Sequence, residues 1–273
     1  MIENNKIKQN AKAHNTIAEV YDLKHPEIYN QVEQRRVEQT IETLLNRVAK
    51  NKPRILDLGS GTGNLALKFL NKGCWVTACD VSQKSLDILS KRANNNSNLE
   101  LSLLIDKKLP FENNSFDVVA TYSVLHHIPD YLFTIKEFIR VLKPGGYIYI
   151  DHEANENKWK PNALLEEYND LTKQTIFEHL IKLFKTRELF TFNFIRSTLI
   201  ISFINNRYKR EGDIHVWIDD HIEWQRIFKI LTENNCSVIE DIDYLMYRPK
   251  CQPALYEKYR KSCTDTKYVF IKK

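Results

Sequence analysis

Glycine is scarce in this sequence, and its few positions therefore indicate where the chain makes special turns. Seven of the 273 residues are glycine, and five of these seven fall in GSGTG at 59–63 and KPGG at 143–146. Both stretches lie next to apolar runs that are typical of buried strands. They mark two turns in a chain whose strand and helix patterns alternate.

Other absences exclude whole classes of protein. The most apolar stretch, residues 189–204, is interrupted by Asn193 and Arg196 and is shorter than the roughly 20 apolar residues that span a bilayer. The polar N-terminus lacks the apolar core of a signal peptide. No CxxC pair or metal-ligand spacing occurs among the cysteines, which indicates free thiols in a reducing compartment. We therefore expect a cytoplasmic protein without stable membrane insertion. The five cysteines are Cys74, Cys79, Cys236, Cys251 and Cys263.

Charge is nearly balanced along the chain. Forty basic residues face 35 acidic ones, and the formal charge of +5 is not gathered into a tail or stripe. Such a distribution does not indicate nucleic-acid binding. Hydrophobic residues make up 42% of the chain, which suffices for a packed core. We expect a globular protein with a small-molecule partner, as a monomer or a homodimer.

The alternation of strand and helix patterns predicts an α/β fold. We predict a Rossmann-like, seven-stranded sheet, mostly parallel, with helices on both faces and an antiparallel C-terminal strand inserted between earlier strands. Ser82 is predicted to cap the helix that follows the second strand. Strand patterns occupy residues 53–61, 74–82, 99–106, 116–125, 147–153, 236–244 and 266–273, and helix patterns between them occupy 63–73, 82–95, 131–142 and 221–235.

Four segments divide the chain. We predict an N-terminal helical cap at 1–52, a core at 53–153, a helical lid at 154–220 and a segment at 221–273 that completes the sheet. Phenylalanines in the lid suggest an apolar or aromatic ligand, or else form the lid's own core. These phenylalanines are Phe184, Phe190, Phe192, Phe194 and Phe203.

The glycine loop itself discriminates between nucleotide ligands. A dinucleotide fingerprint, GxGxxG, would place its third glycine at position 64, which is Asn64. The GK[ST] sequence of a triphosphate-binding loop is missing as well. What is present is a turn where glycine backbone lets a ligand lie close, followed by Asp80 at the end of the second strand. Asp80 is placed to bind the two hydroxyls of a ribose.

Four stretches occur in order: ILDLGSGTG, TACDVS, LPFENNSFDVVATYSVLHHI and VLKPGGYIYI. Together they resemble the successive motifs of class I S-adenosylmethionine-dependent methyltransferases, in the small-molecule, methyltransferase-11-like branch. The resemblance is close over 53–152 and looser over 221–273. It implies S-adenosylmethionine as cofactor, S-adenosylhomocysteine as product, and in-line methylation of oxygen or nitrogen on an apolar, aromatic or peptide-derived acceptor.

The resemblance also implies cofactor contacts. The loop backbone would meet the methionine part, Asp57 its ammonium group, and Asp80 the ribose. Family members usually carry an adenine-binding acid at the position of Ile105, so this contact is either shifted to Asp106 or made by backbone. Tyr21, with His14, would close over the methionine end or belong to the core. The expected cofactor residues are Asp57, Gly59, Ser60, Gly61, Gly63, Asp80, Val81, Ile105, Asp106, Tyr122, Ser123 and Tyr21.

Histidines after the fourth strand are candidates for a general base, which methyl transfer needs only when the acceptor holds its proton firmly. Either His126 or His127 would serve as the base, or as a structural or cofactor contact. In a metal-binding branch of the family, Glu, Glu and His stand where this chain has Ser123, His126 and His127. Because both carboxylates are replaced, we predict no metal.

Two further places are candidates for substrate contact. Asp151 and His152 end the fifth strand and would touch substrate or merely cap the strand; alternation puts Asp151 and Glu153 on one face and His152 on the other. In the segment GDIHVWIDDHIEWQ, His215 and Trp217 are expected to face the substrate. The acids of this segment are expected to begin a helix rather than to bind a metal.

Two alternatives to a small-molecule methyltransferase are kept. One is a non-catalytic protein that binds the cofactor and serves as a scaffold. The other is an RNA or protein methyltransferase. It is less favoured because the fourth strand is followed by TYSVLHHI, not by the Asn/Asp-Pro-Pro-aromatic motif of enzymes that methylate exocyclic amines.

Overall fold

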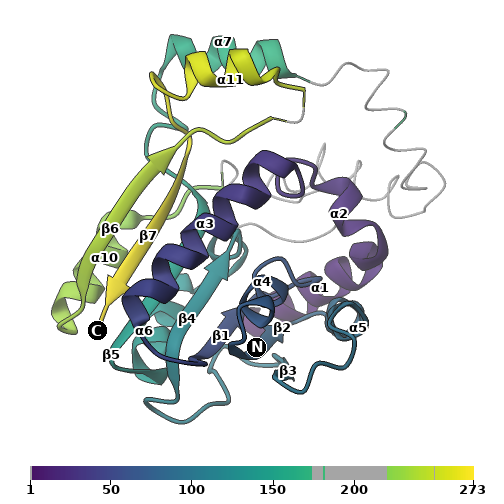
Figure 1. Ribbon diagram of the computed structural model, residues 1–273, viewed down its shortest axis with the longest axis vertical. Helices are drawn as coiled ribbons and strands as arrows, with labels where there is room; N and C mark the ends of the chain where they lie inside the picture. The colour runs from purple at the N-terminus through teal and green to yellow at the C-terminus, as the bar shows by residue number, and fades with distance from the viewer. Residues whose placement is uncertain (1, 174–180, 182–219, 249) are drawn as a thin grey trace.

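A single seven-stranded sheet forms the centre of the protein, in the order β3-β2-β1-β4-β5-β7-β6 (Figure 1). The computed structural model describes residues 2–173, 181, 220–248 and 250–273. Strands β1 to β5 pair in parallel, and β7 is antiparallel to both β5 and β6. The predicted sheet and the insertion of its C-terminal strand are confirmed. The strands are β1 Arg54–Leu58, β2 Trp75–Asp80, β3 Leu99–Leu103, β4 Phe116–Tyr122, β5 Leu142–Ala154, β6 Ser237–Tyr244 and β7 Thr266–Lys272.

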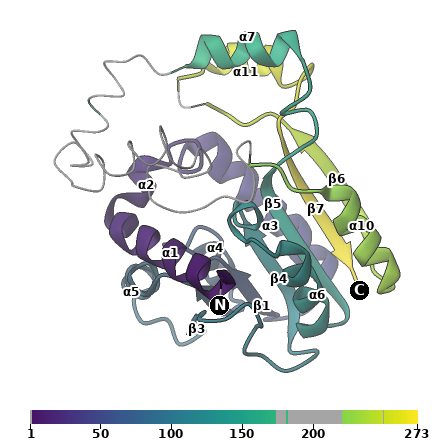
Figure 2. The same ribbon diagram turned by 180° about the vertical axis from the view of Figure 1, so that it is seen from behind.

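Helices cover both faces of the sheet. Helix α3 crosses one face (Figure 1), and α6 and α10 cover the other, seen from behind in Figure 2. The described helices are α1 Ile2–Ile17, η1 Ala18–Val20, α2 Tyr21–Lys24, α3 Gln31–Val48, α4 Ala66–Asn71, α5 Gln83–Arg92, η2 Leu125–His127, α6 Tyr131–Val141, α7 Ala163–Thr172, α10 Trp224–Glu233 and α11 Pro253–Tyr259. None of them is both long and apolar enough to cross a bilayer.

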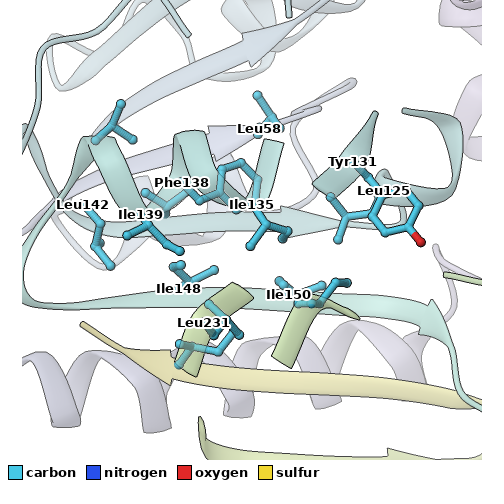
Figure 3. Packing of buried hydrophobic residues seen from close by; sticks show 14 of the residues in the cluster. Leu58, Leu125, Tyr131, Ile135, Phe138, Ile139, Leu142, Ile148, Ile150 and Leu231 are labelled. Carbon is cyan, nitrogen blue, oxygen red and sulfur yellow. The ribbon is translucent and has the colours of Figure 1, made fainter. Parts of the chain in front are cut away.

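Apolar side chains at helical spacing form the core on each face. On the α6 face, Ile135 and Phe138 of α6 pack with Ile148 and Ile150 of β5 and with Leu231 of α10 (Figure 3). All five side chains are fully buried. Burial of such side chains contributes roughly 1.5–3 kcal/mol each. The core therefore holds β4 and β5, whose carboxyl ends carry most of the candidate site.

Local sequence signals fix where the helices begin. The Ser82 hydroxyl accepts a hydrogen bond from the backbone N–H of Ser85 at 3.1 Å, so the predicted cap of α5 is confirmed. The Asn30 side chain caps α3 in the same way, accepting from the N–H of Glu33 at 2.9 Å. These caps set the start of the two helices that flank the glycine loop.

A second, smaller core lies above the end of the sheet. Helix α7, from the segment predicted as a lid, packs side by side with α11, which lies between β6 and β7 (Figures 1 and 2). The sequence patterns did not predict this arrangement, because α11 has only seven residues and no helix was expected between two strands. The small core comprises Leu165, Tyr168, Leu245, Cys251, Tyr259 and Cys263.

Candidate functional site

Three glycines after β1 have left-handed backbone, and they differ in what surrounds the position of a Cβ atom. Gly59 has a φ of 70°, and a Cβ there would lie 2.3 Å from Cγ2 of Val124. Gly63 has a φ of 107°, and its Cβ would lie 2.5 Å from Cδ1 of Leu89 on α5. Gly61 has a φ of 51° and open space where a Cβ would be. The loop thus needs glycine twice for close packing and once where the space is left to a ligand.

A pocket opens over this loop, which we name the glycine-loop pocket. Its wall combines the loop and the end of β2 with α1 and with residues that follow β4. Leu58, Leu104 and Leu109 are among its apolar side chains, which suit a flat heterocycle. Among the predicted cofactor residues, those that line it are Gly59, Gly61, Asp80, Val81, Asp106, Tyr122, Ser123 and Tyr21.

Asp80 ties the loop to the next helix. Its Oδ2 accepts the N–H of Gly61 at 2.8 Å and its Oδ1 the N–H of Ser82 at 2.7 Å. Each carboxylate oxygen has a further lone pair, so two more donors can be accepted from the pocket. Burial raises the pKa of Asp80, and the nearby His14 opposes this shift. The residue can therefore fix the loop and bind a diol at once.

Four expected cofactor residues do not line the described pocket. The N–H of Ser60 donates to the carbonyl of Cys79 at 2.9 Å and is not available to a ligand. Gly63 is turned toward α5, and Ile105 is 78% exposed, whereas Asp106 lines the pocket. Asp57 precedes the loop at the end of β1. Contact of Ser60, Gly63 or Ile105 with a cofactor therefore stays a prediction.

Asp57 has an unusual environment beneath the glycine loop. It is 1% exposed, and its Oδ2 has no hydrogen-bond partner among the described residues. Burial raises the pKa of its carboxyl to about 7, and the negative charge of Asp80 adds to this rise. A hydrogen bond from the backbone N–H of Ala66 lowers the pKa but does not offset burial. A carboxyl poised in this way would ionise readily if a cation were bound above it.

A second pocket adjoins the first, and we name it the histidine pocket. Five of the chain's eight histidines line it: His14, His25, His126, His127 and His152. Glu27, Lys158 and Asp220 add charged groups to its wall. The two pockets share His14, Tyr21, Ser123 and His127 in their walls and are therefore neighbours. Tyr21 and His14, expected beside the cofactor, stand at this boundary.

The end of β5 departs from the predicted alternation. The pairing of β5 with β7 shifts between Ile150 and Glu153, and His152 adopts a φ of 59°. As a result His152 lies on the same side as Asp151, and Glu153 points toward η2. The expectation that Asp151 and Glu153 share a face was wrong, because a β-bulge adds one residue to the strand.

Glu153 holds the turn that carries the paired histidines. Its Oε1 accepts the backbone N–H groups of Val124 at 2.8 Å and Leu125 at 2.7 Å. Its Oε2 lies 2.8 Å from Nδ1 of His126. The carboxylate is fully buried, so it orients His126 within the wall of the histidine pocket. Sequence reasoning missed this role; the only signal was a charged residue at the end of an apolar strand.

Asp151 belongs to a buried network rather than to a pocket wall. It is 0% exposed, and both its oxygens accept from Nη2 of Arg36, at 3.1 and 3.0 Å. The hydroxyls of Tyr149 and Tyr244 also donate to it. Asp151 is not among the residues that line the two described pockets, and its contact with substrate stays a prediction. Arg36 also contacts Glu33.

This network joins parts of the chain that are far apart in sequence. Glu33 and Arg36 come from α3, and their partners come from β4, β5 and β6. Burial would raise the pKa of Glu33, but hydrogen bonds from Arg36 and His152 outweigh it and lower the pKa. In the sequence, the only sign of this network was a pair of charged residues, three positions apart, on an otherwise amphipathic helix.

Two other expectations concern the predicted lid and metals. His215 and Trp217, like the phenylalanines of the lid, lie outside the described residues. Asp220 and His221 precede α10, and Asp220 lines the histidine pocket. Within the described ranges, no three His, Cys, Asp or Glu side chains are grouped so as to hold a metal ion.

Comparisons with known proteins agree with this geometry. A family model described as a methyltransferase domain matches residues 56–150. A curated protein from Schizosaccharomyces pombe, an uncharacterised methyltransferase, is 35% identical over 126 residues, 41% of this chain and 44% of that protein. A demethylmenaquinone methyltransferase from Chlorobaculum tepidum is 39% identical over 102 residues, 37% of this chain and 41% of that protein. The alignments thus span less than half the length of these relatives.

The fold likeness extends over most of the chain. An S-adenosylmethionine-dependent methyltransferase from Mesorhizobium loti superposes with a TM-score of 0.54 at 16% identity, covering 86% of this chain and 96% of the other. Identity at this level shows the fold alone. The domain match falls on β1 to β5, the strands that carry the glycine loop and Asp80. Residues 56–150 are accordingly a methyltransferase domain, and the described chain has the fold of S-adenosylmethionine-dependent methyltransferases.

Proposed function

We propose that the protein binds S-adenosylmethionine in the glycine-loop pocket and transfers its methyl group to a small molecule in the histidine pocket. The observation that carries this proposal is that the two pockets adjoin and share His14, Tyr21, Ser123 and His127 in their walls. Methyl transfer from a sulfonium requires nucleophile, carbon and sulfur in line, with water excluded. Two adjoining pockets with a shared boundary provide that arrangement.

We assign the parts of the cofactor to different residues of the glycine-loop pocket. Asp80 would accept the ribose hydroxyls while it holds Gly61. Val81 would pack on the adenine, and Asp106 would accept from its amino group. Asp57, beneath the loop, would supply negative charge for the ammonium of the methionine part. The boundary residues would surround the sulfonium, whose chemistry is that of the cofactor itself.

The acceptor we propose is polar at the reacting end. The histidine pocket presents imidazoles, two carboxylates and an ammonium group, which favour a ligand with hydroxyl, amino or carboxyl groups. For the rest of the acceptor we propose an apolar or aromatic group, as the phenylalanines of the predicted lid suggest.

The compartment we propose is the cytoplasm, since all five cysteines are free and buried. RNA and membranes are not proposed as partners, and both a monomer and a homodimer are compatible with the site.

Mass spectrometry of acceptors tests the proposed activity. We expect a gain of one methyl group, dependent on S-adenosylmethionine, in at least one member of a panel of phenols, carboxylic acids, amines and thiols. An RNA of mixed sequence serves as the comparison. Methylation of RNA alone would contradict a small-molecule acceptor. Cofactor binding with no methylated product in any sample would favour the non-catalytic alternative.

A further inference from the structure

His152 lies beside the boundary of the two pockets. The bulge in β5 turns its ring onto Tyr122, with ring centroids 4.7 Å apart. Tyr122 lines the glycine-loop pocket, and His152 lines the histidine pocket. The imidazole is only 7% exposed. It is therefore held firmly next to the place where the proposed methyl transfer occurs.

The position of the ring proton follows from counting donors. The Tyr122 hydroxyl donates its one proton to Oε1 of Glu33 at 2.8 Å, and it lies 2.9 Å from Nδ1 of His152. The Tyr244 hydroxyl donates to Asp151 at 3.0 Å and lies 3.3 Å from the same nitrogen. Neither phenol has a second proton. Nδ1 must therefore carry the hydrogen and donate to the oxygen of Tyr122.

The other ring nitrogen is then a base. A neutral imidazole protonated at Nδ1 keeps its lone pair on Nε2. Among the described residues, the polar contacts of the His152 ring are all made by Nδ1, with Tyr122, Tyr244 and Glu33. Because His152 lines the histidine pocket, Nε2 is the ring nitrogen left for a ligand there.

Carboxyl groups lie close to the ring of His152. Oε1 of Glu33 is 3.4 Å from Nδ1 of the ring. Glu33 and the adjacent Asp151 both pair with the single guanidinium of Arg36. These contacts hold the Nδ1 edge of the ring within the network.

We propose, on the basis of the function proposed above, that Nε2 of His152 is the general base for methylation of a hydroxyl group. Tyr122 and Glu33 are its positioning residues. In the reaction the acceptor oxygen forms a bond to the methyl carbon, the carbon–sulfur bond breaks, and its electron pair stays on sulfur. The hydroxyl proton moves to Nε2 and then to water. The acceptor is thus an alcohol or phenol, because a hydroxyl keeps its proton at neutral pH without a base.

Nitrogen NMR of the histidine ring tests this inference without an acceptor. The chain is labelled with ¹⁵N-histidine, saturated with S-adenosylhomocysteine and observed at a pH where the ring is neutral. The His152 signals are assigned by their loss in His152→Ala. We expect the proton on Nδ1. A wild-type ring protonated on Nε2 would overturn the proposal.

Two matched variants test the role of Glu33. Glu33→Gln keeps the size of the side chain but lets an amide donate to Tyr122, whose hydroxyl can then donate to Nδ1. We expect the ring proton to move to Nε2. Glu137→Gln is the control, because Glu137 also pairs with an arginine three residues later on a helix but lies outside the network. An unchanged tautomer in Glu33→Gln would refute its positioning role, and the wild-type spectrum is decisive even if that variant does not fold.

Kinetics with two probes test the base itself. In slightly alkaline buffer phenol keeps its proton, whereas 4-nitrophenol is largely ionised. We expect His152→Ala to lower kcat for phenol about 100-fold or more, with a much smaller loss for 4-nitrophenol and an unchanged KM for S-adenosylmethionine. Equal losses for both probes would refute the base. Transfer by the wild type to amines or thiols but to no hydroxyl compound would refute the acceptor class.

Failure of this inference is distinguishable from failure of the proposed function. If the protein methylates no compound at all, the proposed function fails, and the ring spectrum alone then decides whether His152 is held as a base. If methyl transfer occurs but the ring carries its proton on Nε2, the proposed function stands and the assignment of His152 falls.

Discussion

Replacing Gly59 with alanine is expected to abolish cofactor binding and to lower the free energy of unfolding by about 2–5 kcal/mol, from left-handed strain and overpacking together. The backbone φ is 70°, and the added Cβ would lie 2.3 Å from Cγ2 of Val124. Val124 lines the glycine-loop pocket, so any movement that relieves the clash changes the wall of the site. Urea unfolding and calorimetric titration with S-adenosylmethionine measure the two effects.

Gly73→Ala provides the matched control for this prediction. Gly73 has nearly the same φ, 78°, but no atom lies within 4 Å of an added Cβ. Only the backbone strain remains, and we expect a loss of about 1–2 kcal/mol with unchanged cofactor affinity. Similar losses of stability in the two variants would show that contact with Val124 does not matter.

Replacing Arg36 with methionine is expected to lower the free energy of unfolding by about 3–5 kcal/mol at neutral pH. The substitution keeps much of the apolar stem but leaves Glu33 and Asp151 as buried carboxylates without their cation. The pKa of Glu33, which is lowered in the wild type, should then rise, and that of Asp151, which burial already raises, should rise further. Chemical unfolding of both proteins over a range of pH measures this effect.

The pH dependence of that loss has a definite sign. In the wild type, the lowered pKa of Glu33 contributes stability above the unfolded pKa of a glutamate, about 4.3, and this contribution is lost as the pH falls. In Arg36→Met, both raised carboxyls destabilise the fold as the pH rises. The difference between the two proteins should therefore shrink in acid. A difference independent of pH would contradict the electrostatic cause.

An exposed pair supplies the control for Arg36→Met. Arg260 and Glu257 have the same spacing as Arg36 and Glu33, but both side chains are about half exposed. An exposed ion pair contributes only about 0–1 kcal/mol. We expect Arg260→Met to change the stability within that range. A loss as large as that of Arg36→Met would indicate that helix propensity, not burial, is responsible.

The sheet and the position of the glycine loop could be predicted from sequence because their signals are local. Apolar runs separated by helical segments gave the strands, and the glycine loop with Asp80 is read from residues close in the chain. The C-terminal strand pairs antiparallel with β5 and β6, as its pattern indicated. In these cases a short segment contains the physical reason for its own structure.

The acceptor side could not be predicted because its geometry depends on distant contacts. One additional residue in β5 reverses which way His152 and Glu153 point, and nothing in YIYIDHE shows that bulge. The carboxylate that fixes the His152 ring comes from Glu33, 119 positions earlier in the chain. Helix α3 was predicted from its apolar spacing, which says nothing about which of its charged residues turns inward.

The glycine loop shows the same limit on a smaller scale. Sequence comparison places Gly63 and Ser60 with the ligand contacts, yet one packs on α5 and the other donates to Cys79. Both are necessary for the turn, and a motif does not distinguish a residue that shapes a loop from one that touches its ligand. Gly61, with open space at its Cβ position, is the glycine that the pocket itself requires.

Calorimetric titration of S-adenosylmethionine into the wild type and into Asp80→Ala tests the central claim most directly. If the cofactor lies in the glycine-loop pocket with its ribose on Asp80, the wild type binds it and the variant binds it at least about 100-fold more weakly. This loss corresponds to about 2.8 kcal/mol of binding free energy. Circular dichroism establishes that the variant is folded. Equal affinities in two folded proteins, or no binding by the wild type, would contradict the proposed cofactor site.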